Sequence, residues 1–424
     1  MHIATATTAD PRDAGIMTVN TKPPSVFDAG LPTLHYDITD TVHEVAPRIH
    51  EVRRQSPMAI GPLGPEVLGY ELARGILRDP RFVFPPGLHM SARGITDGPL
   101  YDRVLGTILG MEGDEHRRLR GLVSKAFTPR ASARMEHTID TVINGLIDQV
   151  ADAGRCEFVT DIARPYPIPI ICALLGAPPE DWERFSLWAE DIFKIVRFDS
   201  NLLDEQDVVM RAWDEFDAYI DDMIAERRSR LTDDLISELI RAQDGGDQLS
   251  NAEMRMLAFS ILSAGTDTTR NQLAASMHAL CDHPDQLALL RDNPDLAMRA
   301  VEECMRHSPA VCTTLRTVLD DVTFADYTFP AGTFISVNTY AANCDPEVHP
   351  HPDLFDISRE DPPSILSFGG GAHYCLGANL ARAELAGALK ILARRMPNPR
   401  RVATSPWKPM LGLSGPTSLQ MEFG

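Results

Sequence analysis

The stretch Phe368–Gly377 decides the fold, and it reads FGGGAHYCLG. Three consecutive glycines precede Cys375 and a fourth follows it by two residues, so the backbone can make turns that other residues disfavour. Residues 378–395 have a helical pattern, which places the cysteine at a helix N-terminus, where the helix dipole stabilises negative charge. Both features favour a thiolate, so we expect the pKa of Cys375 to lie below its usual value. Such a sulfur is suited to one bond with a soft metal ion.

The composition is that of a globular protein with few cysteines and an excess of acidic residues. Sixty Asp and Glu against 40 Lys and Arg give a formal net charge of −20, which argues against nucleic-acid binding. Seven cysteines are an odd number and show no CxxC spacing, which disfavours a disulfide framework or a zinc site. The chain starts without the apolar core of a signal peptide, and no apolar run is long enough to span a bilayer. We therefore expect a cytoplasmic protein without membrane insertion.

Most of the chain shows the three- and four-residue apolar spacing of helices. The clearest helix begins at Ser250, because Ser250 and Glu253 have the spacing of a capping box. It continues to about His283, and at about 1.5 Å per residue it is about 50 Å long, so it must cross the whole molecule. Further helices are expected over Arg120–Phe127, Ile139–Ala151, Asp204–Ser229 and Ala378–Arg395, and after Leu235 and Ala297.

Strand patterns are short and few. They predict strands over Met58–Ile60, Val67–Gly69, Val322–Phe324, Phe334–Val337 and Ser418–Phe423. The expected fold class is therefore mainly α with small β-sheets. Residues 1–24 show no periodicity and are expected to form a flexible tail, whereas 25–424 contain no linker or repeat and are expected to form a single domain.

A free cysteine is most often simply buried in a protein core. The pattern around Cys375 favours a ligand instead, because Phe368, Gly371, Cys375 and Gly377 match FxxGxxxCxG, the signature of the cytochrome P450 superfamily. The chain resembles this family over residues 25–424. The resemblance implies haem b (protoporphyrin IX iron), with the Cys375 thiolate as the axial iron ligand and the other three residues beside the haem. It also implies the triangular fold of the family, with a long central helix over the haem.

Glu303 and Arg306 are three residues apart in a helical stretch, so they share a face and can form an ion pair. Such pairs are common on helix surfaces and often contribute little. The resemblance implies that they form a buried structural network with Arg359. The chain departs from the bacterial members at two positions, because Cys344 stands where Arg is usual and Thr317 stands where Ala is common. These departures put local packing in doubt and leave the iron chemistry untouched.

Residues 264–269 read AGTDTT within the long helix. Glycine and threonine disfavour helix interiors, and a threonine hydroxyl can bond a preceding carbonyl and bend the helix. From these residues alone, a harmless kink is an equal alternative to a functional opening. The resemblance implies that Ala264 and Gly265 form the wall of the oxygen pocket. It assigns the catalytic supply of protons to Asp267 and Thr268.

His116 and Arg120 lie one turn apart near the start of a predicted helix, where two cationic donors can clamp a carboxylate. The residues alone favour the alternative of a solvated surface histidine. The resemblance implies that both side chains bind the haem propionates, together with Arg316 and His373.

The resemblance also implies a function. It predicts a soluble bacterial monooxygenase that inserts one atom of dioxygen into a hydrophobic, terpenoid, fatty-acid or steroid-like small molecule while the other atom leaves as water. The chain has no segment for a flavin or an iron–sulfur cluster, so electrons from NAD(P)H are expected to arrive through a separate ferredoxin and ferredoxin reductase. We expect a monomer. Two alternatives remain, an H2O2-dependent peroxygenase of the same fold and a non-catalytic haem-binding or gas-sensing protein, and the intact Asp267–Thr268 pair argues against both.

Two further expectations concern surfaces. The substrate cavity is expected to be apolar and to draw on residues 82–90, 174–175, 188–197, 311–315 and 413. A basic patch near the proximal haem face is expected to attract an acidic ferredoxin. The alternative is that these cations only balance local carboxylates or hold propionates. The basic residues fall in two groups, Arg117, Arg118, Arg120, Lys125 and Arg130, and Arg394, Arg395, Arg400 and Arg401.

Overall fold

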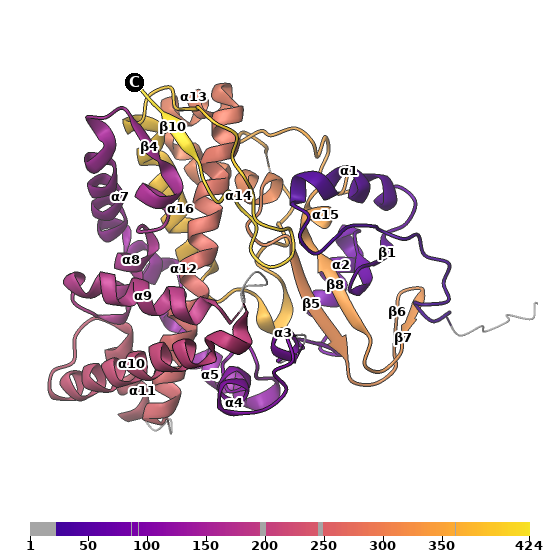
Figure 1. Ribbon diagram of the computed structural model, residues 1–424, viewed down its shortest axis with the longest axis horizontal. Coiled ribbons are helices and arrows are strands. Elements are labelled where there is room, and N and C mark those ends of the chain that lie inside the picture. Colours follow the sequence, from indigo (N-terminus) through magenta and orange to yellow (C-terminus); the bar gives the residue numbers. More distant parts are fainter. Residues whose placement is uncertain (1–22, 86, 92, 196–200, 245–248, 361) are drawn as a thin grey trace, which may run out of the picture.

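The fold is that of a computed structural model, which describes residues 23–424 except positions 86, 92, 196–200, 245–248 and 361. The predicted tail, residues 1–24, falls almost entirely outside the described residues, and the single domain over 25–424 stays a prediction. The described part is mainly helical with small sheets (Figure 1), as predicted. None of its helices is both long and apolar enough to cross a membrane.

Helices make up most of the chain and match most of the predicted helical stretches. In chain order the α-helices are α1 Val42–Arg53, α2 Tyr70–Arg78, α3 Leu88–Ser91, α4 Pro99–Leu105, α5 Gly113–Val123, α6 Pro129–Ala133, α7 Glu136–Ala151, α8 Pro167–Leu175, α9 Trp182–Phe193, α10 Leu202–Ser229, α11 Leu235–Asp244, α12 Asn251–Asp282, α13 Pro284–Asp292, α14 Ala297–His307, α15 Thr339–Asn343 and α16 Ala378–Arg395. Short 3-10 or π turns are η1 Ser124–Phe127, η2 Val159–Ala163, η3 Pro179–Asp181, η4 Pro294–Leu296 and η5 Gly371–His373.

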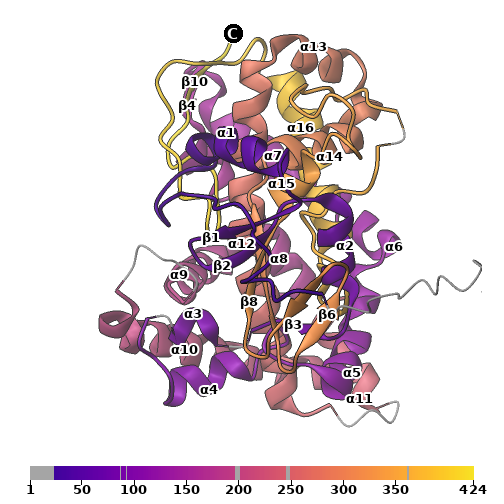
Figure 2. The same ribbon diagram turned by 90° about the vertical axis from the view of Figure 1, so that its right-hand side faces the viewer.

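The long helix α12 runs through the middle of the molecule (Figures 1 and 2). Its predicted capping box is confirmed, because the Glu253 amide donates to the Ser250 hydroxyl at 3.2 Å and the Ser250 amide donates to the Glu253 carboxylate at 2.6 Å. The helix packs against α8, α9, α10, α14 and α16. Contact on so many sides explains why its apolar residues are not confined to one stripe.

The strands form one larger sheet and two small ones. The larger sheet has the order β1-β2-β8-β5-β3, in which β2 and β8 are parallel and the other neighbours are antiparallel. The small sheets are β4-β10-β9 and β6-β7. The strand bounds are β1 Met58–Gly61, β2 Gly64–Val67, β3 Phe82–Val83, β4 Arg155–Glu157, β5 Thr313–Val318, β6 Val322–Phe324, β7 Tyr327–Phe329, β8 Phe334–Asn338, β9 Arg400–Arg401 and β10 Gln420–Glu422.

Three predicted elements need correction. The predicted strand Val67–Gly69 is wrong beyond its first residue, because Gly69 caps α2 and its amide bonds the Pro57 carbonyl at 3.0 Å. The predicted helix Arg120–Phe127 is divided between the end of α5 and the 3-10 turn η1. The predicted strand Ser418–Phe423 is shorter in the structure, where β10 pairs with β4 and β9.

The buried apolar side chains form a large cluster among the helices and two smaller clusters around the larger sheet. Figure 1 shows the corresponding arrangement, with α7 to α10 on one side of α12 and the sheet, α1 and α2 on the other. The loop that precedes α16 contacts α2 through η5. The cysteine loop therefore lies where the helical part and the sheet part meet.

Candidate active site

One cavity of about 350 Å³ brings Cys375 together with the turn of α12 that carries Ala264, Gly265 and Thr268. Its other walls come from α5, α8, α16 and the segment around the end of α4, and they are mainly aliphatic. Phe127 and other apolar side chains complete the lining. A largely apolar pocket with a few convergent polar groups is typical of a site for a cofactor or a small molecule.

The loop before α16 holds Cys375 mainly by its backbone. The Cys375 amide donates to the Phe368 carbonyl at 2.9 Å, and the Gly377 amide donates to the Cys375 sulfur. Gly371 has a φ of 66°, and a Cβ at this position would collide with the Leu77 carbonyl of α2. Gly371 is therefore required for the loop to lie against α2. The four motif residues lie together in this loop.

The predicted lowering of the Cys375 pKa is wrong for the polypeptide chain without a bound metal ion. Burial raises the pKa of this thiol, and the Gly377 amide and the positive charges of Arg120 and Arg382 offset the increase only in part. The loop amides are thus insufficient to ionise a sulfur that is removed from water. A metal ion would supply the missing charge, because a coordinating thiol loses its proton. No group of three or more His, Cys, Asp or Glu suited to a metal ion occurs among the described residues.

The AGTDTT stretch of α12 remains helical, and the structure separates its two predicted catalytic residues. Thr268 lines the cavity with Ala264 and Gly265, and its hydroxyl donates to the Ala264 carbonyl at 2.7 Å. Asp267 does not line the cavity, because its carboxylate pairs with Arg270 at 2.9 Å. The threonine therefore reaches the site directly, whereas the acid is held beside it.

The four predicted propionate-binding residues gather at one edge of the site. His116, Arg120 and His373 line the cavity, and the two imidazole rings lie 4.5 Å apart between centroids. Burial lowers the pKa values of both histidines, so His116 is not the solvated surface histidine that the residues alone favoured. Arg120 donates to the Tyr374 carbonyl next to the cysteine. Arg316 comes from β5 on the sheet side.

Arg316 shows that this edge suits an anionic group. The residue is 3% exposed, and its guanidinium forms no ion pair with a carboxylate of the described residues. It donates to the Leu315 carbonyl at 2.7 Å and to the Thr314 hydroxyl at 3.4 Å. Burial lowers the pKa of Arg316 to about 10, and the negative charge of Glu112 offsets this only in part. A buried cation without a counter-charge is costly, so this edge fits a group that brings carboxylates, as haem does with its propionates.

The predicted network around Glu303 lies outside the cavity. Arg306 donates to both carboxylate oxygens of Glu303 at 2.7 and 2.9 Å, and Arg359 donates to one of them at 3.2 Å. The same two guanidinium groups also donate to backbone carbonyls between Pro350 and Leu354. The three side chains therefore tie α14 to the segment that follows α15.

Both departures from the family pattern are accommodated in the structure. Cys344 is buried at the end of α15 near Arg306, and burial raises the pKa of its thiol to about 11. Thr317 lies in β5, where its hydroxyl donates to the Thr333 carbonyl at 3.1 Å. A small thiol and a bonded hydroxyl fill these positions without disturbing the neighbouring strands and helix.

Three residues of the site were not predicted from the sequence. Glu112 accepts a hydrogen bond from His373 at 2.8 Å, at the cationic edge. Arg382 lies over the Phe368 ring, 4.4 Å from its centroid, and its charge acts on the cysteine sulfur. Glu384 lines the cavity from α16. The last two follow the cysteine by seven and nine residues, so helical spacing along α16 could have indicated them.

The predicted lining of the cavity is correct only in part. Leu174 and Ile195 line it, whereas none of the described side chains within 82–90, 311–315 and 413 does, and positions 86, 196 and 197 lie outside the described residues. Trp188 lines a separate hollow. The segment around the end of α4 contributes instead, through Val104, Thr107, Ile108 and Leu109.

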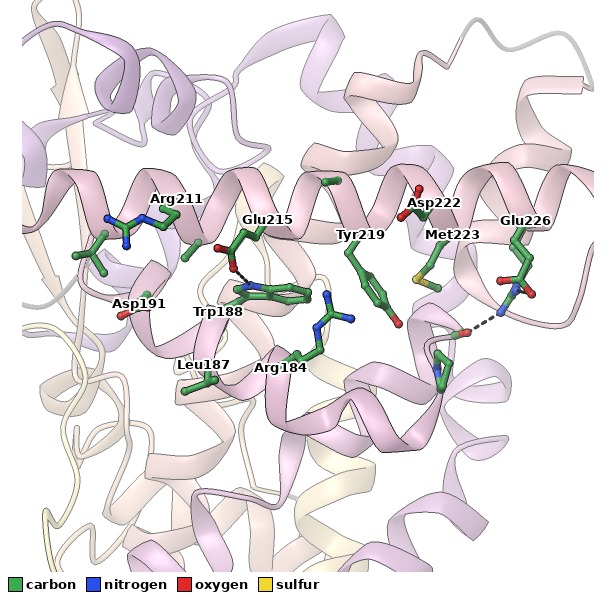
Figure 3. Close-up of a pocket in the computed structure, with 16 residues that line it drawn as sticks. Arg184, Leu187, Trp188, Asp191, Arg211, Glu215, Tyr219, Asp222, Met223 and Glu226 are labelled. Atoms are coloured by element: carbon green, nitrogen blue, oxygen red, sulfur yellow. Dashed lines mark hydrogen bonds and ion pairs between the residues drawn. The ribbon is translucent and has the colours of Figure 1, made fainter.

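A larger hollow of about 790 Å³ lies between α9 and α10 (Figure 3) and contains none of the predicted catalytic or haem-binding residues. The Trp188 indole donates to the Glu215 carboxylate at 3.1 Å. Arg184 lies over the rings of Trp188 and Tyr219, 5.0 Å from each centroid, and the Tyr219 hydroxyl donates to Asp181 at 2.6 Å. These polar side chains are thus already engaged in hydrogen bonds and ring contacts with one another. We therefore assign the chemistry to the cavity at Cys375.

Comparison with known proteins gives one consistent result. The model of the family described as cytochrome P450 matches residues 101–395. The chain is 34% identical over 384 residues to luteothin monooxygenase of Streptomyces thioluteus, an alignment that covers 89% of this chain and 93% of that protein. It is 36% identical over 366 residues to mycinamicin IV hydroxylase/epoxidase of Micromonospora griseorubida, with 84% and 89% covered.

Solved structures agree with these relatives. The crystal structure of CalO2 superposes with a TM-score of 0.85 at 31% identity, covering 92% of this chain and 99% of that chain. P450BioI, in complex with an acyl carrier protein ligated to hexadec-9Z-enoic acid, gives a TM-score of 0.80 at 32% identity, with 89% and 97% covered. The cysteine loop, the cavity beneath α12 and these matches have one explanation: the chain is an enzyme of the cytochrome P450 monooxygenase family.

Proposed function

We propose that this enzyme inserts one oxygen atom from dioxygen into a hydrophobic, terpenoid, fatty-acid or steroid-like small molecule. The observation that carries the proposal is the shared cavity, which has Cys375 and the Ala264–Thr268 turn of α12 in one apolar enclosure. Haem b would be held by Cys375 at its iron and by the cationic edge at its propionates. When bound, it supplies the oxidising chemistry, and the chain supplies the ligand, the protons and the orientation of the substrate.

We propose distinct roles for the two residues of the acid–alcohol pair. The Thr268 hydroxyl is already inside the cavity, where it can hold a proton and an ordered water molecule. Asp267 is bonded to Arg270, so it can supply a proton to the cavity only after this ion pair opens. The strength of the ion pair with Arg270 would then determine how often the Asp267 carboxylate is free to supply a proton.

Substitution of Thr268 tests this role against a matched neighbour. We expect Thr268→Ala to keep substrate binding but to release peroxide in place of product, measured as product and peroxide formed per NADPH oxidised. Thr266→Ala is the control, because the Thr266 hydroxyl also bonds a carbonyl four residues earlier, at 2.7 Å, but does not line the cavity. Equal coupling in wild type and Thr268→Ala would place proton supply elsewhere. Product formed with H2O2 alone, at the same rate in both proteins, would support the peroxygenase.

The substrate class rests on the lining of the cavity. Apart from the edge proposed to hold the haem propionates and from Glu384, the walls are mainly aliphatic, with Ser260, Ser263 and Thr107 as small polar groups. Relatives named for mycinamicin IV and for a fatty-acyl carrier complex agree with large apolar substrates. The test is a titration of the haem-loaded protein with myristic acid, corticosterone and a macrolide, followed by the haem absorption spectrum. Shifts produced only by small charged compounds would contradict the proposed class.

The proposed partners are a ferredoxin and a ferredoxin reductase that bring electrons from NAD(P)H to a monomeric, cytoplasmic enzyme. Lys125 and Arg130 support a docking surface, because both are exposed and neither forms an ion pair among the described residues. Reconstitution with such a pair should couple NAD(P)H oxidation to product. A gas-sensing protein would bind haem without this consumption.

A further inference from the structure

Glu112 brings a carboxylate of the chain itself to the cationic edge of the cavity. The residue immediately precedes α5, and its Oε1 atom accepts two hydrogen bonds. One comes from the His373 imidazole Nε2 at 2.8 Å, and the other comes from the Phe84 amide at 3.0 Å. Glu112 therefore joins the start of α5, the segment after β3 and the cysteine loop.

The Glu112 carboxylate also acts on the buried arginine of this edge. Burial lowers the pKa of Arg316, and the negative charge of Glu112 offsets this only in part. The two side chains do not form an ion pair, because the Arg316 guanidinium donates to Leu315 and Thr314 instead. The charges of Glu112 and Arg316 both act on His373. Glu112 is thus a partial counter-charge that the chain supplies to the edge.

The groups that Glu112 engages are those that a haem propionate would use. His373 and Arg316 lie at the edge with His116 and Arg120, and we propose above that these four side chains hold the propionates. A propionate that accepts the Nε2–H of His373 competes with Glu112, because one N–H group donates one hydrogen. Two carboxylates that approach the same donor also repel each other. The edge therefore cannot serve Glu112 and the propionates equally well.

Of these groups, Glu112 is the one that can leave. Its side chain is 36% exposed, so its carboxylate can turn into water, whereas the His373 side chain is 10% exposed. Gly113, the next residue, has a φ of 70° and no neighbouring atom within 4 Å of a Cβ position, so the turn before α5 is open on this side. Arg316, by contrast, is buried within β5.

We propose that Glu112 is an internal counter-anion, which occupies the cationic edge in the haem-free protein and which the haem propionates displace during loading. The contact is autoinhibitory, because it engages His373 and partly balances Arg316 before the cofactor arrives. One hydrogen-bond acceptor replaces another, and no covalent bond or electron is involved. The inference rests on the proposed binding of haem at this edge.

Haem uptake by the haem-free protein tests the proposal without turnover. Growth of the Soret band after mixing with haem b measures uptake, and transfer to apomyoglobin measures release. At low ionic strength we expect Glu112→Gln to take up haem at least about 3-fold faster than wild type, and to release it more slowly, because the amide lacks the competing charge. Glu115→Gln is the matched control, because it makes the same change at an exposed position of α5 and should behave as wild type.

A porphyrin without carboxylates separates this competition from a general loosening of the edge. Iron protoporphyrin IX dimethyl ester carries esterified propionates, so Glu112 meets no anion. We expect wild type and Glu112→Gln to take up the ester at equal rates, and the difference with haem b to shrink at high salt. An equal gain in rate with the ester would overturn the proposal, because the substitution would then act without the propionates.

Release gives the second decisive outcome. Faster release of haem b from Glu112→Gln than from wild type would overturn the proposal, because Glu112 would then help to hold the cofactor. Equal uptake of haem b by both proteins would overturn it as well and leave the proposed function intact. Failure of wild type to bind haem b at all would overturn the proposed function, and the inference with it.

Discussion

Two buried groups of charged side chains in this protein differ in whether the chain itself balances them. Around Glu303, the guanidinium groups of Arg306 and Arg359 meet a carboxylate and a set of backbone carbonyls. At the cavity edge, Arg316 and Arg120 meet backbone carbonyls without a carboxylate ion pair among the described residues. The first group is balanced by its own carboxylate, whereas the second lacks a counter-charge, which fits the proposed binding of an anionic ligand at this edge. Charge balance would thus distinguish a structural network from a binding site.

Removing the carboxylate of the group around Glu303 should have the largest effect. Glu303→Gln leaves two buried guanidinium groups without a counter-charge, so we expect a loss of about 3–5 kcal/mol in the free energy of unfolding. Urea denaturation of the haem-free protein measures this loss. Glu51→Gln is the control, because Glu51 pairs with Arg54 on an exposed face, and no measurable change is expected there. A change of equal size in both variants would remove the distinction between the two groups.

For the group at the cavity edge, removal of a charged side chain should not lower the free energy of unfolding. Arg316→Met removes a buried cation that the chain does not balance, so we expect the haem-free protein to be equally or more stable by urea denaturation. Haem, by contrast, should dissociate about 10- to 100-fold faster, because charge-assisted hydrogen bonds to a carboxylate are lost. Transfer of haem to apomyoglobin measures the rate. A strong loss of stability without a change in haem transfer would make Arg316 structural.

The stability of the protein should also depend on pH, because His307 and His349 lie near the guanidinium groups around Glu303. Burial, followed by the charge of Arg306, lowers the pKa of each histidine to about 4, below the unfolded value of 6.5. Between these values the unfolded chain binds more protons, so stability is complete above pH 6.5 and falls as the pH decreases towards 4. We expect a loss of about 1–2 kcal/mol per histidine at pH 5. Urea denaturation at pH 7 and pH 5 checks the size, and a flat profile would contradict it.

His349→Gln isolates one of the two contributions. The His349 side chain is buried and its Nε2 atom has no hydrogen-bond partner among the described residues. The variant should lose less stability than wild type between pH 7 and pH 5. An unchanged difference between the two pH values would assign the effect to other groups.

The smallest effect concerns cations on the surface, where the same distinction applies. Arg117 pairs with Asp114, whereas Lys125 is exposed and without an ion pair among the described residues. We therefore expect Lys125→Glu to slow reduction by an acidic ferredoxin about 3-fold at low ionic strength, and Arg117→Glu to have less effect. Stopped-flow reduction at low and high salt measures both. Equal rates for Lys125→Glu and wild type at low salt would place the docking site on another face.

Much of the fold could be predicted because its signals are local. The capping box at Ser250 and the helix that follows Cys375 depend on residues a few positions apart, and both are confirmed. The strand β5, inside the larger sheet, could not be predicted, because its identity depends on pairing with β8 and β3. Gly69 shows the same limit, since its contact with Pro57 ends the predicted strand.

The site follows the same rule. Phe368, Gly371 and Cys375 were found because the loop that they form is continuous in sequence. Burial could not be read from the motif, and it reverses the expected direction of the Cys375 pKa. Glu384 was not predicted, because its place in the site depends on the cavity and on Thr269, which lies on another helix.

The central claim is that Cys375 binds haem iron as a thiolate, and the spectrum of the reduced carbon monoxide complex tests it most directly. We predict that wild type loaded with haem b gives the red-shifted Soret band of a thiolate-ligated carbonyl complex. Cys375→Ser should lose this band while remaining folded, because serine is a harder and far less acidic ligand. Cys281→Ser should keep it, because this thiol lies on α12 and does not line the cavity. A red-shifted band that persists in Cys375→Ser would contradict the account.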